Sequence, residues 1–439
     1  MFESHGLGSF TPPTPGEIVN HPRRIPLLAV GVLTALLAAA CGGNQSNEGS
    51  ANADSPSVTA GGGGKPADNG LPPVLVGFHG LEGGQISLAD MRLGFEAGVD
   101  YVNQELGGIN GHPLRAEICK TDVTPESSVN CANKFVSQNV VLAVQGVDYA
   151  GDAALPVLKQ AGIVDVSAFA YGPSENTALG DAYISEGSNE EGYASSLVAL
   201  KKLGATSVAE VLADVPANHT IMTKVIKPAA DKLGLKLSPF FYPAQTDWTS
   251  FAATVVSAKV DGVTLFATDA DCLGAVPALR SSGYTGLIHA GVCSVVVDKL
   301  NPSMLKNVII GSPFYNSTMT PIPAGPQKDL DIFSRYMAAH KELKNRGQAQ
   351  QGFFVAVWAA DMLRQIPGDP LTAKTVHDNI GKTKGPLLFR TNGYDCSKPT
   401  WPGTTACGGG YIFTKATADR KNEVLPDQPV DVSVVLPTS

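Results

Sequence analysis

The sequence predicts an α/β protein built on two doubly wound parallel sheets. Short apolar runs such as residues 74–78 are typical of buried parallel strands, and amphipathic helices separate them. The plan strand, loop, helix, glycine, strand also occurs twice, in residues 140–166 with Gly162 and in residues 263–289 with Gly283. Strands separated by helices of this size require right-handed parallel crossovers, so each half of the chain should hold one such sheet.

Residues 1–40 have the features of a bacterial lipoprotein signal peptide. Arg23 and Arg24 precede an apolar run over residues 27–40, which ends in three alanines beside Cys41. Small residues at that place suit cleavage, and Cys41 would become the lipidated first residue, so we expect an extracytoplasmic protein anchored to the cell membrane. A simple secreted protein and a transmembrane anchor are the alternatives, although the run is shorter than the roughly 20 residues that a bilayer core requires.

The composition of residues 41–72 is typical of a flexible linker, because it is rich in Gly, Ser, Asn, Ala and Pro. About 370 residues follow, which is more than one hydrophobic core normally organises, so two lobes are expected. The net charge of -8, with 32 Lys and Arg residues, offers no basic patch and argues against nucleic acid as a partner.

Six cysteines besides Cys41 fall into three local pairs. In an exported protein such pairs are expected to form disulfides, and closing three short loops is the simplest of the possible pairings. Metal binding is the alternative, but no pair has the C-x-x-C spacing of a zinc site, and we expect no metal or cofactor. The expected disulfides join Cys119 to Cys131, Cys272 to Cys293 and Cys396 to Cys407.

The first predicted strand, residues 74–78, is followed by a helix that Ser87 caps, with Asp90 three residues further on. The apolar residues of this helix fall at steps of three and four until Gly107 and Gly108 end it. In doubly wound sheets, ligands bind beyond the carboxyl ends of the strands, so two such sheets facing each other would form a cleft lined by loops. Further elements are expected over residues 114–119 (strand), 129–138 (helix) and 140–144 (strand).

Residues 106–111, Leu-Gly-Gly-Ile-Asn-Gly, are followed by Pro113 and Leu114 and resemble a turn of the branched-chain amino acid binding proteins. This family contains the leucine-binding receptors of ABC transporters. The resemblance extends over roughly residues 73–425 in the expected order, which makes it more specific than any single motif. Its other segments are residues 160–164 at a helix-to-strand step, 185–192 at the first lobe crossing and 385–389, Gly-Pro-Leu-Leu-Phe.

The resemblance implies a type I periplasmic-binding-protein fold, in which hinge crossovers join two αβα lobes that close around a ligand. Lobe 1 would hold residues 73–186 and 313–385, and lobe 2 residues 187–312 and 386–439. The implied function is that of a solute receptor of an ABC importer, and not of an enzyme. It would take an amino acid or a related small polar compound and present it to permease subunits in the membrane.

The resemblance places one set of ligand contacts in the loop after the third strand. Ala150 stands where relatives have a serine against the ligand carboxylate, with Tyr149 before it and Gly151 after it. The backbone N–H groups of Ala150 and Gly151, at a helix start, would still suit an anion.

A second set of implied contacts follows the fourth strand. Phe169, Ala170 and Tyr171 replace small residues and a threonine, which indicates a narrower or more stacking-prone pocket. Packing at the lobe rim is the alternative role of Tyr149 and Tyr171.

In lobe 2 the corresponding loops offer five polar candidates. Relatives hold an α-ammonium group with an acid near the last of these loops, where this chain has Cys293 and Ser294. Asp269 or Asp271 can substitute for that acid, and Asp271 has capping of the following helix as an equal alternative. The candidates are Asn218, Thr268, Asp269, Asp271 and Ser294.

Three further features have a structural interpretation. His219 is expected at the surface of a helix start rather than as a ligand or base. Trp248 follows Asp247, which with Thr246 is a candidate helix cap. A stripe of apolar residues four apart is expected in the core, namely Phe354, Trp358, Met362 and Ile366.

Two other functions fit the same scaffold. A secreted enzyme finds little support, because the sequence has no H-E-x-x-H, G-x-S-x-G or P-loop motif. A ligand sensor would use the same closing clamp to signal to a partner protein. The identity of the ligand stays open, since Ala150, Tyr171 and Ser294 replace the residues that define amino-acid binding in the relatives.

Overall fold

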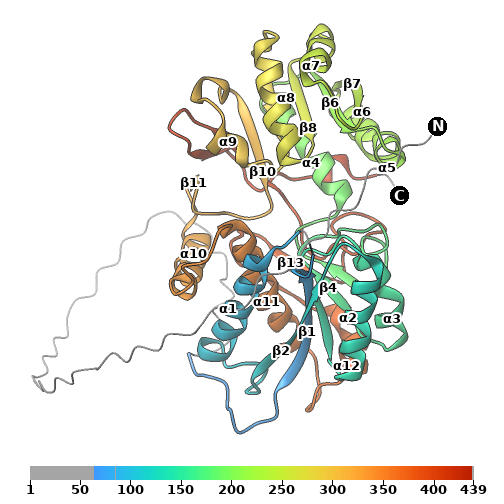
Figure 1. Ribbon diagram of the computed structural model, residues 1–439, viewed down its shortest axis with the longest axis vertical. Coiled ribbons are helices and arrows are strands. Elements are labelled where there is room, and N and C mark those ends of the chain that lie inside the picture. The colour runs from blue at the N-terminus through green and yellow to red at the C-terminus, as the bar shows by residue number, and fades with distance from the viewer. Residues whose placement is uncertain (1–63, 85, 438–439) are drawn as a thin grey trace, which may run out of the picture. The chain divides into compact units, whose positions relative to one another are not determined.

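The computed structural model describes residues 64–84 and 86–437. The predicted signal peptide, Cys41 and most of the predicted linker lie outside these residues. The described part has the predicted α/β architecture, with two sheets of mainly parallel strands and helices on both faces of each (Figure 1). None of the helices in it combines the length and the apolar character needed to span a bilayer.

The first sheet has five parallel strands in the order β2-β1-β3-β4-β5. Successive residues of a strand point to opposite faces, and β1 shows how both faces are covered. A Cβ at Gly77 would collide with the ring of Phe135 in α2 (Pro125–Ser137), whereas Phe78 stacks on Phe95 of α1 (Ala89–Glu105) with the ring centroids 4.3 Å apart. The strands are β1 (Val74–Leu81), β2 (Leu114–Thr121), β3 (Leu142–Gln145), β4 (Asp165–Ser167) and β5 (Ala182–Ile184).

Helix α1 packs along α11 (Arg346–Arg364) on one face of this sheet. Two glycines permit the close approach, because a Cβ at Gly94 would run into the backbone of Ala349 and one at Gly352 into that of Met91. The predicted core stripe is confirmed, since each of its four side chains is at most 3% exposed. Other helices of this half are α3 (Leu155–Gln160), α10 (Ala324–Met337) and α12 (Ala373–Asn379), with short turns η2 (Gly151–Ala153) and η5 (Ile380–Lys382).

The predicted cap of α1 is wrong. The helix starts at Ala89, and Ser87 makes no capping hydrogen bond to it. Instead, the buried carboxylate of Asp90 accepts the backbone N–H groups of Lys344 and Asn345, at 3.0 and 2.5 Å. This long-range contact ties the start of α1 to the start of α11, which local sequence patterns do not reveal.

The second sheet has eight strands in the order β11-β15-β14-β10-β9-β8-β6-β7. Strands β6 to β10 are parallel, and β14 runs antiparallel to β10. The predicted unit β8, α8, β9 is present here, as the equivalent unit is in the first sheet. The strands are β6 (Ser207–Ala213), β7 (Lys236–Tyr242), β8 (Gly262–Phe266), β9 (Leu287–His289), β10 (Val308–Ser312), β11 (Met319–Thr320), β14 (Ile412–Ala416) and β15 (Asn422–Val424).

Helices cover both faces of this sheet as well. Ala209 and Val211 of β6 pack with α7 and α8, while Val208 and Leu212 pack with α4 and α6 on the other face. The helices are α4 (Asn189–Lys202), α5 (Pro216–Ile221), α6 (Lys227–Leu233), α7 (Trp248–Ser257), α8 (Asp269–Ser281) and α9 (Val295–Lys299), with the short turns η3 (Met222–Ile226), η4 (Pro302–Met304) and η6 (Ser433–Val435).

Two segments lie elsewhere than the sequence predicts. The N–H groups of Ala67 and Asp68 donate to the carbonyls of Asn103 and Gly111, so the chain is fastened before residue 73. Residues 386–396 and 405–407 lie beside the first sheet rather than the second, whereas Trp401 between them packs in a core cluster of the second sheet. They include β13 (Gly393–Asp395), which pairs with β12 (Lys384–Pro386), and Cys407, whose N–H donates to Ile184 of β5.

The three disulfides pair the cysteines as predicted: Cys119 with Cys131, Cys272 with Cys293 and Cys396 with Cys407. The first joins β2 to α2, and the third closes the loop after β13. The second joins the first turn of α8, which follows β8, to the loop after β9, so the segments at the carboxyl ends of two neighbouring strands are covalently linked.

Candidate functional site

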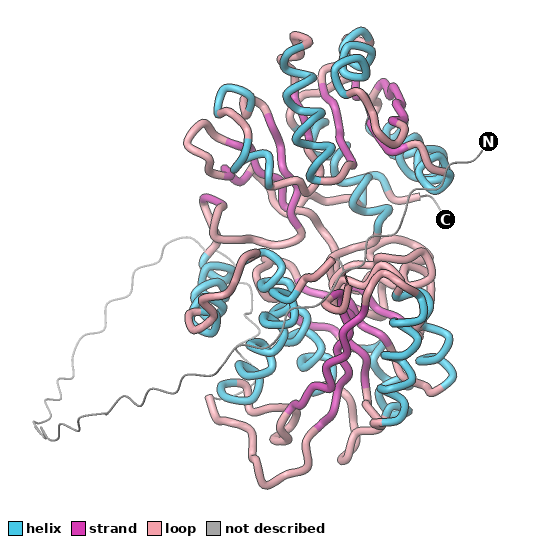
Figure 2. Tube along the Cα trace, viewed as in Figure 1, coloured by secondary structure: helices cyan, strands magenta, loops and turns pink. Residues whose placement is uncertain are grey.

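The loops after β3 and β4 meet at the carboxyl edge of the first sheet, because parallel neighbours end at the same edge. Figure 2 shows loops gathered where these strands end. Tyr149, Phe169 and Tyr171 form one aromatic cluster there, with centroid distances of 5.8 Å between Tyr149 and Tyr171 and 5.6 Å between Phe169 and Tyr171. Tyr149 is 58% exposed, the other two rings are half-buried, and Ala170 is buried. The aromatic cluster thus leaves ring surface open at this edge.

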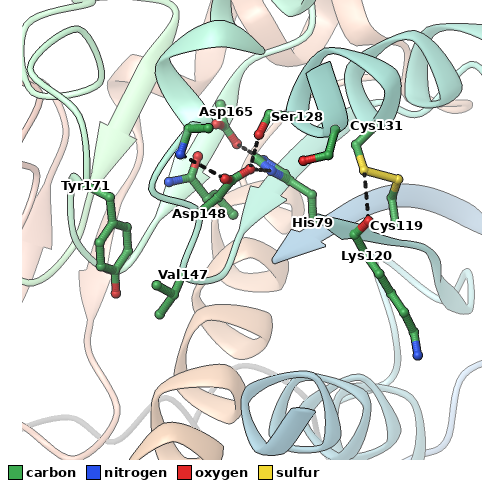
Figure 3. A network of polar contacts seen from close by, with 12 residues as sticks. His79, Cys119, Lys120, Ser128, Cys131, Val147, Asp148, Asp165 and Tyr171 are labelled. Atoms are coloured by element: carbon green, nitrogen blue, oxygen red, sulfur yellow. Dashed lines mark hydrogen bonds and ion pairs between the residues drawn. A yellow bond between two sulfur atoms is a disulfide. The ribbon is translucent and has the colours of Figure 1, made fainter. Parts of the chain in front are cut away.

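A buried ion-pair network holds the same edge together (Figure 3). His79 lies between two acids, with Nδ1 3.1 Å from Asp148 Oδ2 and Nε2 3.6 Å from Asp165 Oδ1. Ser128 Oγ donates to the same Asp148 oxygen at 2.8 Å. Burial would lower the pKa of His79, but the hydrogen bond to Asp148 and the adjacent Asp165 carboxylate outweigh it and raise that pKa to about 10. The imidazole is therefore positively charged at neutral pH.

Asp148 also occupies the backbone donors of its own loop. Its Oδ1 accepts the N–H of Ala150 at 3.0 Å, and its carbonyl accepts the N–H of Gly151 at 3.1 Å. The prediction that these two N–H groups are open to an anion is wrong, because an acid of the chain itself takes them. Burial would raise the pKa of Asp148, yet the contact with His79 keeps it below its usual value.

Two carboxylates fix the loop after β4. Glu175 accepts the N–H groups of Tyr171 and Gly172 at 2.8 and 3.2 Å, and Asp152 accepts the N–H groups of Ser174 and Glu175, each at 3.1 Å. Burial raises the pKa of Glu175 to about 7. The backbone that carries Tyr171 is thus held by hydrogen bonds to side-chain acids, so its path is defined before any ligand arrives.

At the carboxyl edge of the second sheet, the predicted residues serve several roles. Asn218 donates its amide to the carbonyl of Ala213 at 2.8 Å. Thr268, and not Asp271, is the cap of α8, because its Oγ1 accepts the N–H of Asp271 at 3.2 Å and donates to Asp271 Oδ2 at 2.8 Å. Asp269 and Ser294 are exposed. Asp269 is therefore the candidate acid with an open carboxylate at this edge.

The structural interpretations of three residues are confirmed. His219 is exposed, lies 2.8 Å from Asp214 Oδ1 and stacks on Phe241. Asp247 caps α7 by accepting the N–H of Thr249 at 3.1 Å. Trp248 packs against the core of the second sheet.

A buried polar row crosses the second sheet and was not predicted. Glu210, Thr264 and His289 are register partners on β6, β8 and β9, and at most 3% of each is exposed. Burial raises the pKa of Glu210 to about 8 and lowers that of His289 to about 3, so both side chains are neutral at neutral pH. The sequence feature that could have predicted this row is a polar residue inside each of three otherwise mainly apolar strands.

A second unpredicted cluster lies where the chain passes between the sheets. Glu186 accepts a hydrogen bond from Gln351 at 3.1 Å, and Glu191 accepts one from Thr400 at 2.7 Å. The buried guanidinium of Arg390 donates to two backbone carbonyls. Burial raises the pKa of Glu186 to about 7. Within residues 64–84 and 86–437, no group of three or more side chains is arranged to hold a metal ion.

The chain matches a protein family whose members share this fold. A family model described as periplasmic binding protein matches residues 74–398, which is most of the chain. A comparison with curated protein sequences gives no match.

Solved structures share the fold at low sequence identity. The substrate-binding protein of a branched-chain amino acid transporter from Streptococcus pneumoniae, in complex with isoleucine, aligns with a TM-score of 0.60, 17% identity, and coverage of 80% of this chain and 99% of that chain. An ABC transporter substrate-binding protein from Desulfitobacterium hafniense, in complex with Leu, aligns with a TM-score of 0.62 and 15% identity, and the alignment covers 80% of this chain and 100% of that chain. A fatty acid ABC transporter substrate-binding protein from Thermomonospora curvata aligns with a TM-score of 0.63 and 14% identity, and the alignment covers 84% of this chain and 95% of that chain.

Proposed function

Because the chain belongs to the family of periplasmic binding proteins and has their type I fold, we propose that it is the extracytoplasmic solute receptor of an ABC importer. It captures a small solute, an amino acid or a related polar compound, when its two lobes close, and delivers it to permease subunits in the membrane. Lipid attached at Cys41 would hold it at that membrane. It acts by binding alone and carries out no chemical reaction.

The observation that carries this proposal is the pair of parallel sheets whose carboxyl edges bear open aromatic and polar side chains. Ligands of such sheets bind at that edge. On the first sheet the aromatic cluster supplies contact surface, and on the second Asp269 supplies an open carboxylate. We assign ligand contact to residues of these loops: Tyr149, Ala150, Gly151, Phe169, Ala170, Tyr171, Asn218, Thr268, Asp269, Asp271 and Ser294.

Thermal unfolding of the purified full chain tests the proposal. One class of small solute should raise the melting temperature, because a ligand at a hundred times its Kd adds about 2.7 kcal/mol to the free energy of unfolding. Tyr149→Ala should weaken this shift. Val434→Ala removes a side chain of similar exposure at the other end of the chain and should leave the shift unchanged. No shift with any member of a broad panel of amino acids, amides, amines and small carboxylates would contradict a receptor for such solutes.

A further inference from the structure

The aromatic cluster presents its open ring surface through Tyr149. The planes of Tyr149 and Phe169 stand at 77° and 71° to the plane of Tyr171, which lies between them. The three rings therefore meet edge to face rather than in a flat stack. The ring surface that Tyr149 leaves open is of the kind that attracts an ammonium group. Tyr149 is 58% exposed, so most of its ring is not used in packing.

The loops after β3 to β5, β6 and β8 contain acidic side chains and neither Lys nor Arg. Residues 146–154 and 168–188, which follow β3 to β5, contain acids but neither Lys nor Arg. The same holds for residues 214–220 and 267–273 at the carboxyl edge of the second sheet. A cationic solute would meet carboxylates at both edges, whereas an anionic solute would meet no countercharge in these loops.

The place where an anion would bind on the first sheet is also taken. Asp148 holds the N–H of Ala150 with its carboxylate, and this carboxylate is itself fixed by His79. A ligand carboxylate would have to break a buried ion pair to reach these donors. Such a displacement is costly, because the freed acid would remain buried.

Two buried acids flank Tyr171. Glu175 accepts its backbone N–H, and Gln351, which hydrogen-bonds Glu186, also contacts its hydroxyl. Arg390 is the cation whose charge acts on Glu186. It is only 4% exposed and is engaged with backbone carbonyls, so it is not offered to a solute.

From these contacts we propose that the solute carries an organic cation, an amine or a quaternary ammonium, which lies against Tyr149, Phe169 and Tyr171. The inference rests on the proposed function and names the class of its solute. It requires no carboxylate on the ligand. The acids near Tyr171 and Asp269 on the second sheet supply the complementary charge.

Titration calorimetry of the full chain with isosteric pairs tests this class. Choline is compared with its neutral isostere, in which carbon replaces nitrogen, and isopentylamine is compared with isopentanol and with leucine. At least one of the cations should bind at least about tenfold more tightly than its neutral partner, and isopentylamine at least as tightly as leucine. Tyr149→Leu and Tyr171→Leu should remove the preference for the cation. Tyr171→Phe, which keeps the ring, should retain it, and Val434→Ala is the matched control.

The outcomes separate the two proposals. Equal binding of cation and neutral isostere, tighter binding of leucine than of isopentylamine, or a bound solute without positive charge overturns the cation inference and leaves the receptor function intact. Absence of binding by every cationic, neutral and acidic solute contradicts both. Should Tyr171→Leu fail to fold, Tyr149→Leu still provides the test, because Tyr149 is exposed and its replacement should not disturb folding.

Discussion

His79 keeps a positive charge inside the protein because two acids share it. Asp148 and Asp165 are far from His79 in sequence, and the imidazolium joins β1 to the loop after β3 and to the first residue of β4. Removing one partner of such a buried pair leaves an uncompensated charge, which costs far more than the pair gains over apolar packing. The network therefore fixes the loop that carries Tyr149 more than it adds to stability.

We expect His79→Leu to lower the free energy of unfolding by about 3–5 kcal/mol, because Asp148 and Asp165 would stay buried without a cation. The pH dependence should change as well. The pKa of His79 is raised to about 10 in the folded state, so its stabilisation is complete below its unfolded pKa of about 6.5 and is lost as pH rises toward 10. Denaturant titrations of the wild type between these pH values should show falling stability, and the variant should lack this decline.

His219→Leu is the matched control. This histidine also contacts an acid, but it is exposed, so its replacement should change stability by less than about 0.5 kcal/mol. A flat profile for the wild type across the same range would mean that His79 is not charged in the folded state.

At the scale of elements, the contact of α1 with α11 depends on residues without side chains. We expect Gly94→Ala to cost about 1–3 kcal/mol, because the added methyl group meets the backbone of Ala349. Gly325→Ala, in α10, adds the same group into open space and should be neutral or stabilising by up to about 1 kcal/mol. Equal effects of the two substitutions in urea unfolding would contradict the assigned packing.

Periodicity predicts the units that are stabilised locally, such as β8, α8 and β9, and the cysteine spacing predicts the disulfides. It does not predict contacts between distant segments. Asp90 reads as part of a helix cap, yet it binds backbone N–H groups of Lys344 and Asn345.

In the candidate site, too, the sequence predicts the locally determined features but not the long-range contacts. The order of strands places Tyr149 and Tyr171 at one edge, so their proximity follows from the sequence. That Asp148 takes the donors of Ala150 depends on side-chain geometry, which no local pattern contains. The buried Glu210 was visible as one acid in an apolar strand, but its alignment with Thr264 depends on strand register.

At the scale of the whole molecule, attachment and binding should be separable. We expect Cys41→Ala to release the protein from the membrane fraction while its affinity for solute stays unchanged, because the proposed contacts all lie beyond residue 140. Fractionation of cells and calorimetry of the released protein measure the two properties. Retention in the membrane would show that Cys41 is not the anchor, and loss of affinity would show that the two roles are coupled.

The backbone hydrogen bonds of Ala67 and Asp68 determine at which edge of the first sheet the chain enters the fold. Their partners Asn103 and Gly111 lie beside the start of β2, at the edge opposite the aromatic cluster. Any pull transmitted through the preceding residues therefore acts on the amino ends of the strands. With the lipid anchor proposed at Cys41, such a pull would reach the fold at the edge that does not carry the rings.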